Sequence, residues 1–469
     1  IRQFLVESAL LNGVSVVVAL ALVGLALPMF NFFTGQELSF SLLVSAPFWG
    51  AMAALYAGGT LLSGAYPAFV LSGFRPISVL KGEMRGSKEG IFLRKGLVVF
   101  QFAASIFLLA GSLTVYRQIS FMRAQNLGLN IDQTVVLKPP PIRVDSTFER
   151  QTNAFKQEML RESGIKSVTV SSSVPGEDVR WNAGGIHLIG ADEADSKQYR
   201  VIAVDYDFLN AYELKLKAGR PFSKEFGSDN KAVIFNEAGL KLLGLSAEAA
   251  LGKQIFFWGD TCNVVGIAEN FHQQSLREAY EPLILQLRPD VRGKISIKTA
   301  SGDVQKTLAS LQQGWTKFFP GNPFDYFFLD EHFDEQYKAD QRFGQVFGLF
   351  TLLAILVACM GLFGLASFTT AQRTKEIGVR KVLGASIFGI IRMLYREFAL
   401  LILISFLLAT PVAWYASGRW LQEYAFRVNI AWWQFALPFV VVLSIAFLTV
   451  SFQSLKAALI NPAQSLRSE

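Results

Sequence analysis

Six long stretches of the chain contain no Lys, Arg, Asp or Glu. A helix needs about 20 apolar residues to cross a hydrocarbon layer roughly 30 Å thick, and each stretch can supply them. The pattern therefore predicts an α-helical membrane protein with six transmembrane helices. We place these spans near residues 5–28, 43–66, 96–117, 344–371, 398–418 and 432–455.

The segment between the third and fourth spans, residues 118–342, has a different pattern and is expected to be a mixed α+β domain. Short alternating or apolar runs predict strands, and apolar side chains at helical spacing predict helices. Strands are expected at 134–138, 165–171, 184–190, 198–205, 231–235, 254–258, 262–269, 295–297 and 324–329. Helices are expected at 148–160, 237–243 and 304–318. Asn236 is a suitable N-cap for the helix at 237–243, and Gly244 is a suitable end for it.

The order of these elements predicts two subdomains. A strand–helix–strand unit at residues 130–174 is followed much later by a second one at 291–330. We therefore expect these two pieces to form one subdomain, interrupted by a β-rich insertion at 175–290. Residues 117–125 and 330–342 contain no Gly or Pro, whereas flexible linkers are rich in Gly, Ser and Pro. These two segments are interpreted as helical stalks that continue the third and fourth spans into the domain.

The position of the cations predicts which side each connection faces. The net charge is +7, and its excess lies in two short connections rather than in a patch typical of nucleic-acid binding. Cytoplasmic loops carry such excesses, so both termini are expected to be cytoplasmic and residues 118–342 to be periplasmic. The cations concerned are Arg75, Lys81, Arg85, Lys88, Arg94 and Lys95, and then Arg373, Lys375, Arg380, Lys381, Arg392 and Arg396.

The sequence also contains an internal repeat. Glu7-Ser-Ala-Leu-Leu opens the first span and Glu397-Phe-Ala-Leu-Leu opens the fifth. The segment that begins with Arg75-Pro76 and continues to Lys81-Gly-Glu83 is similar to the one that begins with Asn461-Pro462 and continues to Arg467-Ser-Glu469. The repeat implies that the opening span of the first copy precedes this sequence, so we expect the chain to be a fragment of a longer one.

No motif in the sequence predicts chemistry. Ion-coupled transporters keep ionisable side chains inside the membrane, and the six apolar stretches contain none. There is no phosphate-binding Gly-rich loop with the required spacing. His272 is interpreted as structural, and Asp205, Asp207 and Glu237 as solvated or capping residues. We therefore expect no catalytic residue, no cofactor and no metal site, and a protein that is not an enzyme and is driven by another one.

The strongest local signal lies at residues 373–397, and we call residues 373–393 the coupling element. Glu376 and Arg380 stand four residues apart in the favourable order for a helical ion pair. Val379, Val382 and Leu383 line an apolar side of this helix. Gly384 is suited to end it, and Ser386 to cap the next helix. A short basic amphipathic helix of this kind either lies on anionic lipid or docks into the groove of a partner.

These residues resemble a known family. The run Glu376-Ile-Gly-Val-Arg-Lys-Val-Leu-Gly-Ala-Ser386 resembles the cytoplasmic signature of the FtsX-like permeases, the membrane subunits of MacB- and LolCE-type ABC systems. Asn461 to Arg467 resembles the C-terminal motif of that family, and Tyr66 to Gly82 its counterpart in the first half. Val204 to Phe208, Gly219 to Phe222, Asn236-Glu237 and Gly252-Lys253 resemble the MacB-like periplasmic domain. The variant that the chain resembles is the two-repeat permease common in Bacteroidetes.

The resemblance implies a domain plan. Residues 1–95 would end the first FtsX-like repeat, and 96–117 would form a transmembrane helix and the start of a stalk. Residues 118–342 would form the MacB-like periplasmic domain, and 343–469 the second FtsX-like permease domain with the coupling element. The chain would lie in the bacterial inner membrane as a multi-pass protein.

The resemblance also implies a mechanism, in which a separate cytoplasmic ABC ATPase moves the periplasmic domain by mechanotransmission. The cargo would be peptides, lipoproteins or amphiphiles, and the partners would be the ATPase, membrane lipid and a periplasmic adaptor or outer-membrane protein, without nucleic acid. The residues that would contact the ATPase are Lys375, Glu376, Ile377, Gly378, Val379, Arg380, Lys381, Gly384, Ala385 and Ser386. The alternative is an FtsX-type regulator that activates a periplasmic partner such as a cell-wall hydrolase.

Overall fold

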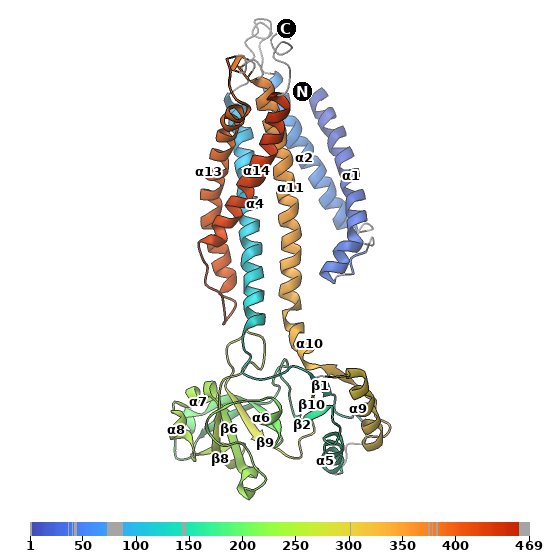
Figure 1. The fold of residues 1–469 in the computed structure, drawn as a ribbon, viewed down its shortest axis with the longest axis vertical. Coiled ribbons are helices and arrows are strands. Elements are labelled where there is room, and N and C mark those ends of the chain that lie inside the picture. Colours follow the sequence, from blue (N-terminus) through green and yellow to red (C-terminus); the bar gives the residue numbers. More distant parts are fainter. Residues whose placement is uncertain are drawn as a thin grey trace. The chain divides into compact units, whose positions relative to one another are not determined.

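The fold is taken from a computed structural model of the chain (Figure 1). The structure describes residues 2–35, 37–39, 41, 45–72, 88–142, 147–300, 302–373, 376–377, 379–380 and 383–458. Contacts divide the chain into two compact units. The first, here called the helical unit, comprises residues 1–116, 340–417 and 430–469. The second, the α/β unit, comprises residues 117–339 and 418–429.

The charge-free stretches form long helices. They are α1 (Arg2–Thr34), α2 (Ala46–Ser72), α4 (Lys88–Ala124), α11 (Lys338–Gln372), α13 (Ile387–Leu421) and α14 (Trp433–Ala458). Five helices of the described chain are long and apolar enough to cross a membrane, and α2 is not among them. Within the described residues, each of the six predicted spans is thus largely helical. The length and apolar character needed for crossing are met by α1, α4, α11, α13 and α14.

The helical unit has its own core, to which α4, α11, α13 and α14 contribute. Ser405 on α13 donates to the carbonyl oxygen of Val99 on α4 over 2.9 Å. The hydroxyls of Ser112 and Thr351 lie 3.0 Å apart and join α4 to α11. Such small polar side chains hold apolar helices together where lipid offers no hydrophobic driving force. Helices α1 and α2 pack on each other, with the Asn12 amide donating to Ser63 over 3.0 Å.

In the described chain, the α/β unit holds one sheet of eleven strands. Their path is β11-β1-β10-β2-β4-β3-β7-β8-β6-β9, with β5 paired to β8. The strands are β1 (Thr134–Leu137), β2 (Ile165–Ser171), β3 (Asn182–Leu188), β4 (Lys197–Val204), β5 (Leu216–Gly219), β6 (Ala232–Asn236), β7 (Gln254–Phe257), β8 (Asp260–Ala268), β9 (Leu283–Leu287), β10 (Lys294–Thr299) and β11 (Tyr326–Phe328).

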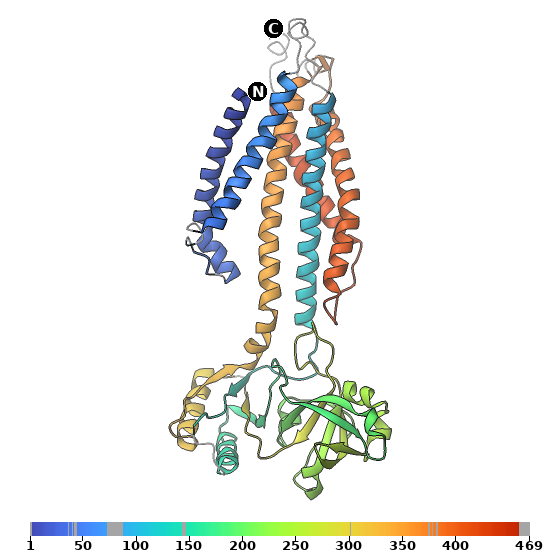
Figure 2. The same ribbon diagram turned by 180° about the vertical axis from the view of Figure 1, so that it is seen from behind.

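The two predicted strand–helix–strand pieces interlock. Strand β10 pairs antiparallel with both β1 and β2, and β11 pairs antiparallel with β1. The resulting order, β11-β1-β10-β2, is that of a split βαβ sheet. The connecting helices α5 (Phe148–Met159) and α9 (Val304–Phe318) lie side by side (Figures 1 and 2). Phe155 of α5 meets Trp315 of α9 edge to face at 6.2 Å in the core of this subdomain.

The insertion forms a second subdomain with its own core. It is joined to the first through the pairing of Ser171 in β2 with Val204 in β4. The predicted helix at 237–243 is confirmed as α7 (Glu237–Leu243). The Asn236 side chain accepts from the Gly239 N–H, and Gly244 ends the helix with φ of 75°. Strands β5 and β9 were not predicted from the sequence.

Both predicted stalk segments are helical. Helix α4 continues to Ala124, and residues 329–337 form α10 (Leu329–Asp334) and the short η4 (Glu335–Tyr337) before α11 begins. In addition, residues 418–429 belong to the α/β unit, which the sequence pattern did not predict. The shorter helices α6 (Phe208–Ala211) and α8 (Ala247–Ala250), with η2 (Glu193–Asp195) and η3 (Gly227–Lys231), complete the α/β unit as described.

Candidate functional site

The coupling element begins as a helix at the end of α11. Residues 376, 377, 379 and 380 are helical, and the Ile377 N–H donates to the Arg373 carbonyl over 2.9 Å. Arg380 Nη2 lies 2.8 Å from Glu376 Oε1, so the predicted ion pair is confirmed. Lys375, Gly378 and Lys381, which the sequence also assigned to this site, lie outside the described residues. So do Val382, residues 73–82 and the motif at 461–467.

A fixed turn ends this helix and starts the next. Gly384 has φ of 89°, and the Ala385 N–H donates to the Arg380 carbonyl over 2.9 Å. This six-to-one bond after a left-handed residue is a Schellman motif, and glycine adopts the left-handed conformation without steric cost. The Ser386 hydroxyl accepts from the Gly389 N–H over 3.1 Å and caps α13. The predictions that Gly384 ends the first helix and that Ser386 caps the next one are confirmed.

The apolar side chains of the coupling element divide into buried and exposed ones. Ile377 is buried in the core of the helical unit. In contrast, Val379 is 48% exposed and Leu383 is 80% exposed. Arg380 reaches from the first helix to Met393 on α13, with 2.7 Å between Nη1 and Sδ. Contacts within the chain therefore hold the turn in place, while Val379 and Leu383 form an exposed apolar edge.

At the other end of α4 and α11, the stalks end in one hydrophobic core of the α/β unit. Met122 of α4, Phe333 of α10 and Tyr337 of η4 are all buried in it. The Leu276 N–H donates to the Tyr337 hydroxyl over 3.3 Å. Beside these residues lies a cavity of about 670 Å³, lined by both stalk ends. Both stalks are therefore packed into the α/β unit as part of its core.

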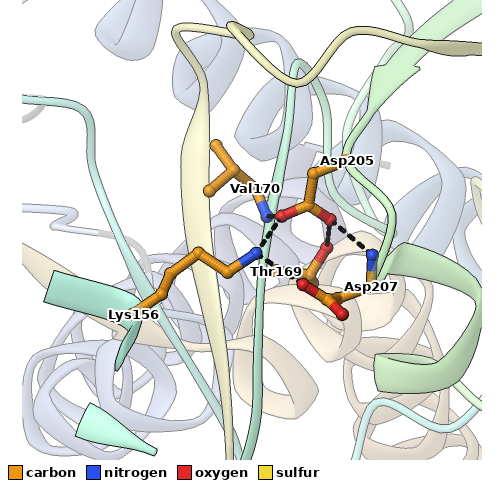
Figure 3. Close-up of polar contacts among 5 residues, drawn as sticks. All are labelled: Lys156, Thr169, Val170, Asp205 and Asp207. Atoms are coloured by element: carbon orange, nitrogen blue, oxygen red, sulfur yellow. Dashed lines mark hydrogen bonds and ion pairs between the residues drawn. The ribbon is translucent and has the colours of Figure 1, made fainter. Parts of the chain in front are cut away.

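A buried charge cluster ties the two subdomains together (Figure 3). Lys156 on α5 donates to Asp205 and, over 2.8 Å, to Asp207. Asp205 also accepts from the Thr169 hydroxyl over 2.5 Å and from the Val170 N–H over 2.9 Å. Burial opposes the charged amine, yet the charge and hydrogen bonds of Asp205 and Asp207 raise the pKa of Lys156. A buried charge is stable only when it is paired in this way.

This cluster corrects the expectation that Asp205 is a solvated or capping residue, whereas the side chains of Asp207 and Glu237 remain partly exposed, as expected. Asp205 is buried within the cluster, and Asp207 is bound to Lys156. Glu237 accepts from Lys217 and from the Asn270 N–H over 3.1 Å. The hydrogen bond from Lys217 lowers the pKa of Glu237, with burial opposing it. Sequence spacing missed these roles because the partners of each acid lie far away in the chain.

His272 is a packing residue, as predicted. It is buried, and its ring centroid lies 4.5 Å from that of Tyr280 and 4.7 Å from that of Phe426. Burial lowers the pKa of His272 to about 4. The imidazole is therefore neutral at physiological pH.

Comparison with known proteins places this architecture in a class. Residues 101–313 match the model of the MacB-like periplasmic core domain, and residues 348–462 match that of the FtsX-like permease C-terminal domain. Together with the apolar helices, these matches define a membrane permease with an inserted periplasmic domain. The chain therefore carries a MacB-like periplasmic core domain and an FtsX-like permease C-terminal domain, the combination typical of FtsX-like and MacB-like permeases.

One relative is the macrolide export ATP-binding/permease protein MacB of Aggregatibacter actinomycetemcomitans, 26% identical over 260 residues. The match covers 52% of this chain and 38% of that protein, so the chain spans well under half the length of this relative.

Two solved structures are also similar. The periplasmic region of MacB from Actinobacillus actinomycetemcomitans has 16% identity and a TM-score of 0.31, over 44% of this chain and 94% of that one. The extracellular domain of the noncanonic ABC-type transporter YknZ from Gram-positive bacteria has 17% identity and a TM-score of 0.30, over 41% and 97%.

Proposed function

We propose that the chain is the permease subunit of an ABC transporter that works by mechanotransmission. ATP hydrolysis by a separate cytoplasmic ATPase would move the periplasmic domain and so export or extract peptides, lipoproteins or amphiphiles. The observation that carries the proposal is the burial of both stalk ends, through Met122, Phe333 and Tyr337, in one core of that domain. A helix end held in this way can transmit a displacement, since packed cores do not deform continuously.

The coupling element supports docking of the ATPase. Val379 and Leu383 present exposed apolar surface beside the Glu376–Arg380 ion pair, on a turn whose geometry Gly384 and Ser386 fix. An amphipathic helix with such a face suits a groove on a partner. The name of the MacB relative, which joins ATP binding to permease function, supports an ABC-type partner.

The proposed arrangement has six spans, with α2 as the additional one and both termini in the cytoplasm. The charge-free stretch at 38–74 and the cations of the two connections support it. We further propose that the chain performs no chemistry of its own and that a periplasmic adaptor or outer-membrane protein contacts the periplasmic domain. The FtsX-type regulator is not favoured, because the matched domain is the MacB-like periplasmic core domain.

The docking proposal is tested by exchanging the two charges of the coupling element. The double variant Glu376→Lys, Arg380→Glu retains an ion pair within the helix but reverses the order of charges that the helix presents to a partner. The tagged chain is purified from its own cells in mild detergent, and vanadate-sensitive ATP hydrolysis in the purified material is measured. We expect the double variant to lose most of this activity while it still inserts into the membrane.

The matched control exchanges another exposed ion pair, Lys231→Asp with Asp260→Lys, in the α/β unit. This control should retain the full activity. Full activity in the coupling-element variant would place docking elsewhere. ATP hydrolysis by the isolated chain, expressed without an ATPase, would overturn the proposed function itself.

A further inference from the structure

The segment that joins α13 to α14 is bound to the α/β unit. We call residues 418–429 the outer loop. The Ala425 N–H donates to the Arg277 carbonyl over 2.9 Å, and the Phe426 N–H donates to the Leu276 carbonyl over 3.2 Å. Arg277 Nη2 also lies 2.7 Å from Glu423 Oε2. Two backbone bonds and an ion pair thus attach the loop to one short stretch of the domain.

Gln118, on the stalk portion of α4, holds the same loop from another side. Its amide nitrogen donates to the Phe426 carbonyl over 2.8 Å, and its amide oxygen accepts from the Val428 N–H over 2.9 Å. The side chain is 0% exposed. A fully buried carboxamide that uses both ends on one loop is costly to replace, because two backbone groups of the loop would lose their partner.

Aromatic side chains of the loop complete the attachment. Tyr424 is buried in the core that also holds Met122, Phe333 and Tyr337. Phe426 packs against His272 and Tyr280, with ring centroids 4.7 Å and 5.0 Å apart. The buried ring of Tyr424 and the partly buried ring of Phe426 provide most of the binding energy of such a contact, since the exposed ion pair contributes little.

The outer loop is also the direct continuation of the coupling element. Ser386 caps α13, and α13 is helical from Ile387 to Leu421, where the outer loop has already begun. One helix therefore leads from the coupling element to residues bound in the domain. This path does not pass through either stalk.

We infer that α13 and the outer loop form a third mechanical connection, in which Gln118 clamps the loop to the domain and α13 carries the movement of the coupling element to it. The inference rests on the proposed function, because it requires a docked ATPase to move α13. Leu276 is where the paths meet, since its N–H binds Tyr337 at the end of a stalk and its carbonyl binds Phe426 of the loop.

The test uses the full chain with its copurified ATPase and the variant Gln118→Met, which keeps the side-chain size and removes both hydrogen bonds. Amide hydrogen exchange is compared without nucleotide and with ATP plus vanadate. In the variant, the amides of 425, 426 and 428 should exchange roughly 10- to 100-fold faster, because the loop loses both hydrogen bonds to Gln118. The nucleotide-dependent change in exchange within the α/β unit should fall by at least half, with ATPase copurification unchanged.

The matched control is Asn322→Leu, which removes another side-chain amide that holds a loop, through a 2.8 Å bond from the Ile142 N–H. It should leave residues 425–428 protected and the nucleotide response intact. A second pair of variants tests the ion pair of the loop. Arg277→Glu alone should speed amide exchange in the loop by about two- to five-fold. Arg277→Glu combined with Glu423→Arg should restore the wild-type exchange rate.

Two results would overturn the inference. The loop could remain protected in Gln118→Met, or it could be released while the nucleotide response of the domain stays at the wild-type level. If the wild-type chain itself gives no nucleotide response, the proposed function fails together with the inference. That outcome is distinguishable because the wild type, rather than the variant, then lacks the response.

Discussion

Arg373 and Glu397 form an ion pair with 2.5 Å between Nη2 and Oε1, although 24 positions separate them in the chain. Arg373 follows α11 and Glu397 lies on α13, so the ion pair connects the two ends of the segment that contains the coupling element. The turn at Gly384 and the contact of Arg380 with Met393 complete the brace. The coupling element is therefore oriented by contacts within the chain before any partner is present.

Reversal of one charge in this pair should weaken docking of the ATPase. Both side chains are about one-third exposed, so Arg373→Glu is expected to cost about 1 kcal/mol and to lower ATPase affinity roughly five-fold. The affinity is measured by titration of the purified chain with its ATPase. Arg373→Glu combined with Glu397→Arg should recover the wild-type affinity, and an unrecovered affinity would indicate that Arg373 contacts the ATPase itself.

Gly384→Ala should disturb the coupling element through its backbone alone. No atom lies within 4 Å of the position that a Cβ would take, but φ is 89° there. A side chain in this left-handed conformation costs about 1–2 kcal/mol, so ATPase affinity should fall roughly 5- to 30-fold. Gly348→Ala, in α11 with equally open space and no positive φ, is the control and should retain the affinity. Gly384→Asn should also be tolerated better than Ala, and equal losses for Asn and Ala would contradict the backbone explanation.

Lys156→Met should destabilise the α/β unit strongly. The substitution leaves Asp205 buried without its cation, which typically costs about 3–5 kcal/mol. Lys156→Met with Asp205→Asn removes both charges and should regain part of this stability. Thermal unfolding of the α/β unit is followed by tryptophan fluorescence in the full chain. Because the pKa of Lys156 is raised above 10.5, this contribution is complete below pH 10.5 and is lost as the pH rises through the raised value.

The stability of the α/β unit should also fall between pH 6.5 and pH 4. Burial lowers the pKa of His272 from 6.5 to about 4, so in this window the unfolded chain binds a proton that the folded chain does not. Stability then decreases as the pH falls, by up to about 3 kcal/mol at pH 4. The pH dependence is obtained from denaturant unfolding at several pH values. His272→Phe should flatten it in this window, and an unchanged slope in the variant would assign the effect to other groups.

Met122→Ala tests whether the stalk end must be packed for movement to be transmitted. Removal of this buried side chain should cost about 2–5 kcal/mol locally. The nucleotide-dependent change in hydrogen exchange of the α/β unit should decrease, while ATP hydrolysis by the docked ATPase continues. Leu160→Ala, at an exposed position of the same unit, serves as the control. A full nucleotide response in Met122→Ala would argue against transmission through α4.

The amino-acid sequence alone determined the features that depend on near neighbours. The long helices follow from charge-free stretches, because a buried or lipid-facing helix satisfies its backbone hydrogen bonds within itself. The ends of α7 at Asn236 and Gly244, and the turn at Gly384 and Ser386, also follow from residues within a few positions. The expected ion pair of Glu376 with Arg380 belongs to the same group.

Tertiary structure alone decided the contacts between distant residues. Asp205 could not be recognised as buried, because Lys156 lies 49 positions away. In the sequence Gln118 cannot be distinguished from other stalk residues, because the loop residue to which it donates a hydrogen bond lies 308 positions away. Strand β9 pairs with β4 and β6, and no turn signal links them in sequence. Local hydrogen bonds and the spacing of hydrophobic residues are encoded in short segments. The pairings between distant residues depend instead on the tertiary fold, which brings them together across long loops.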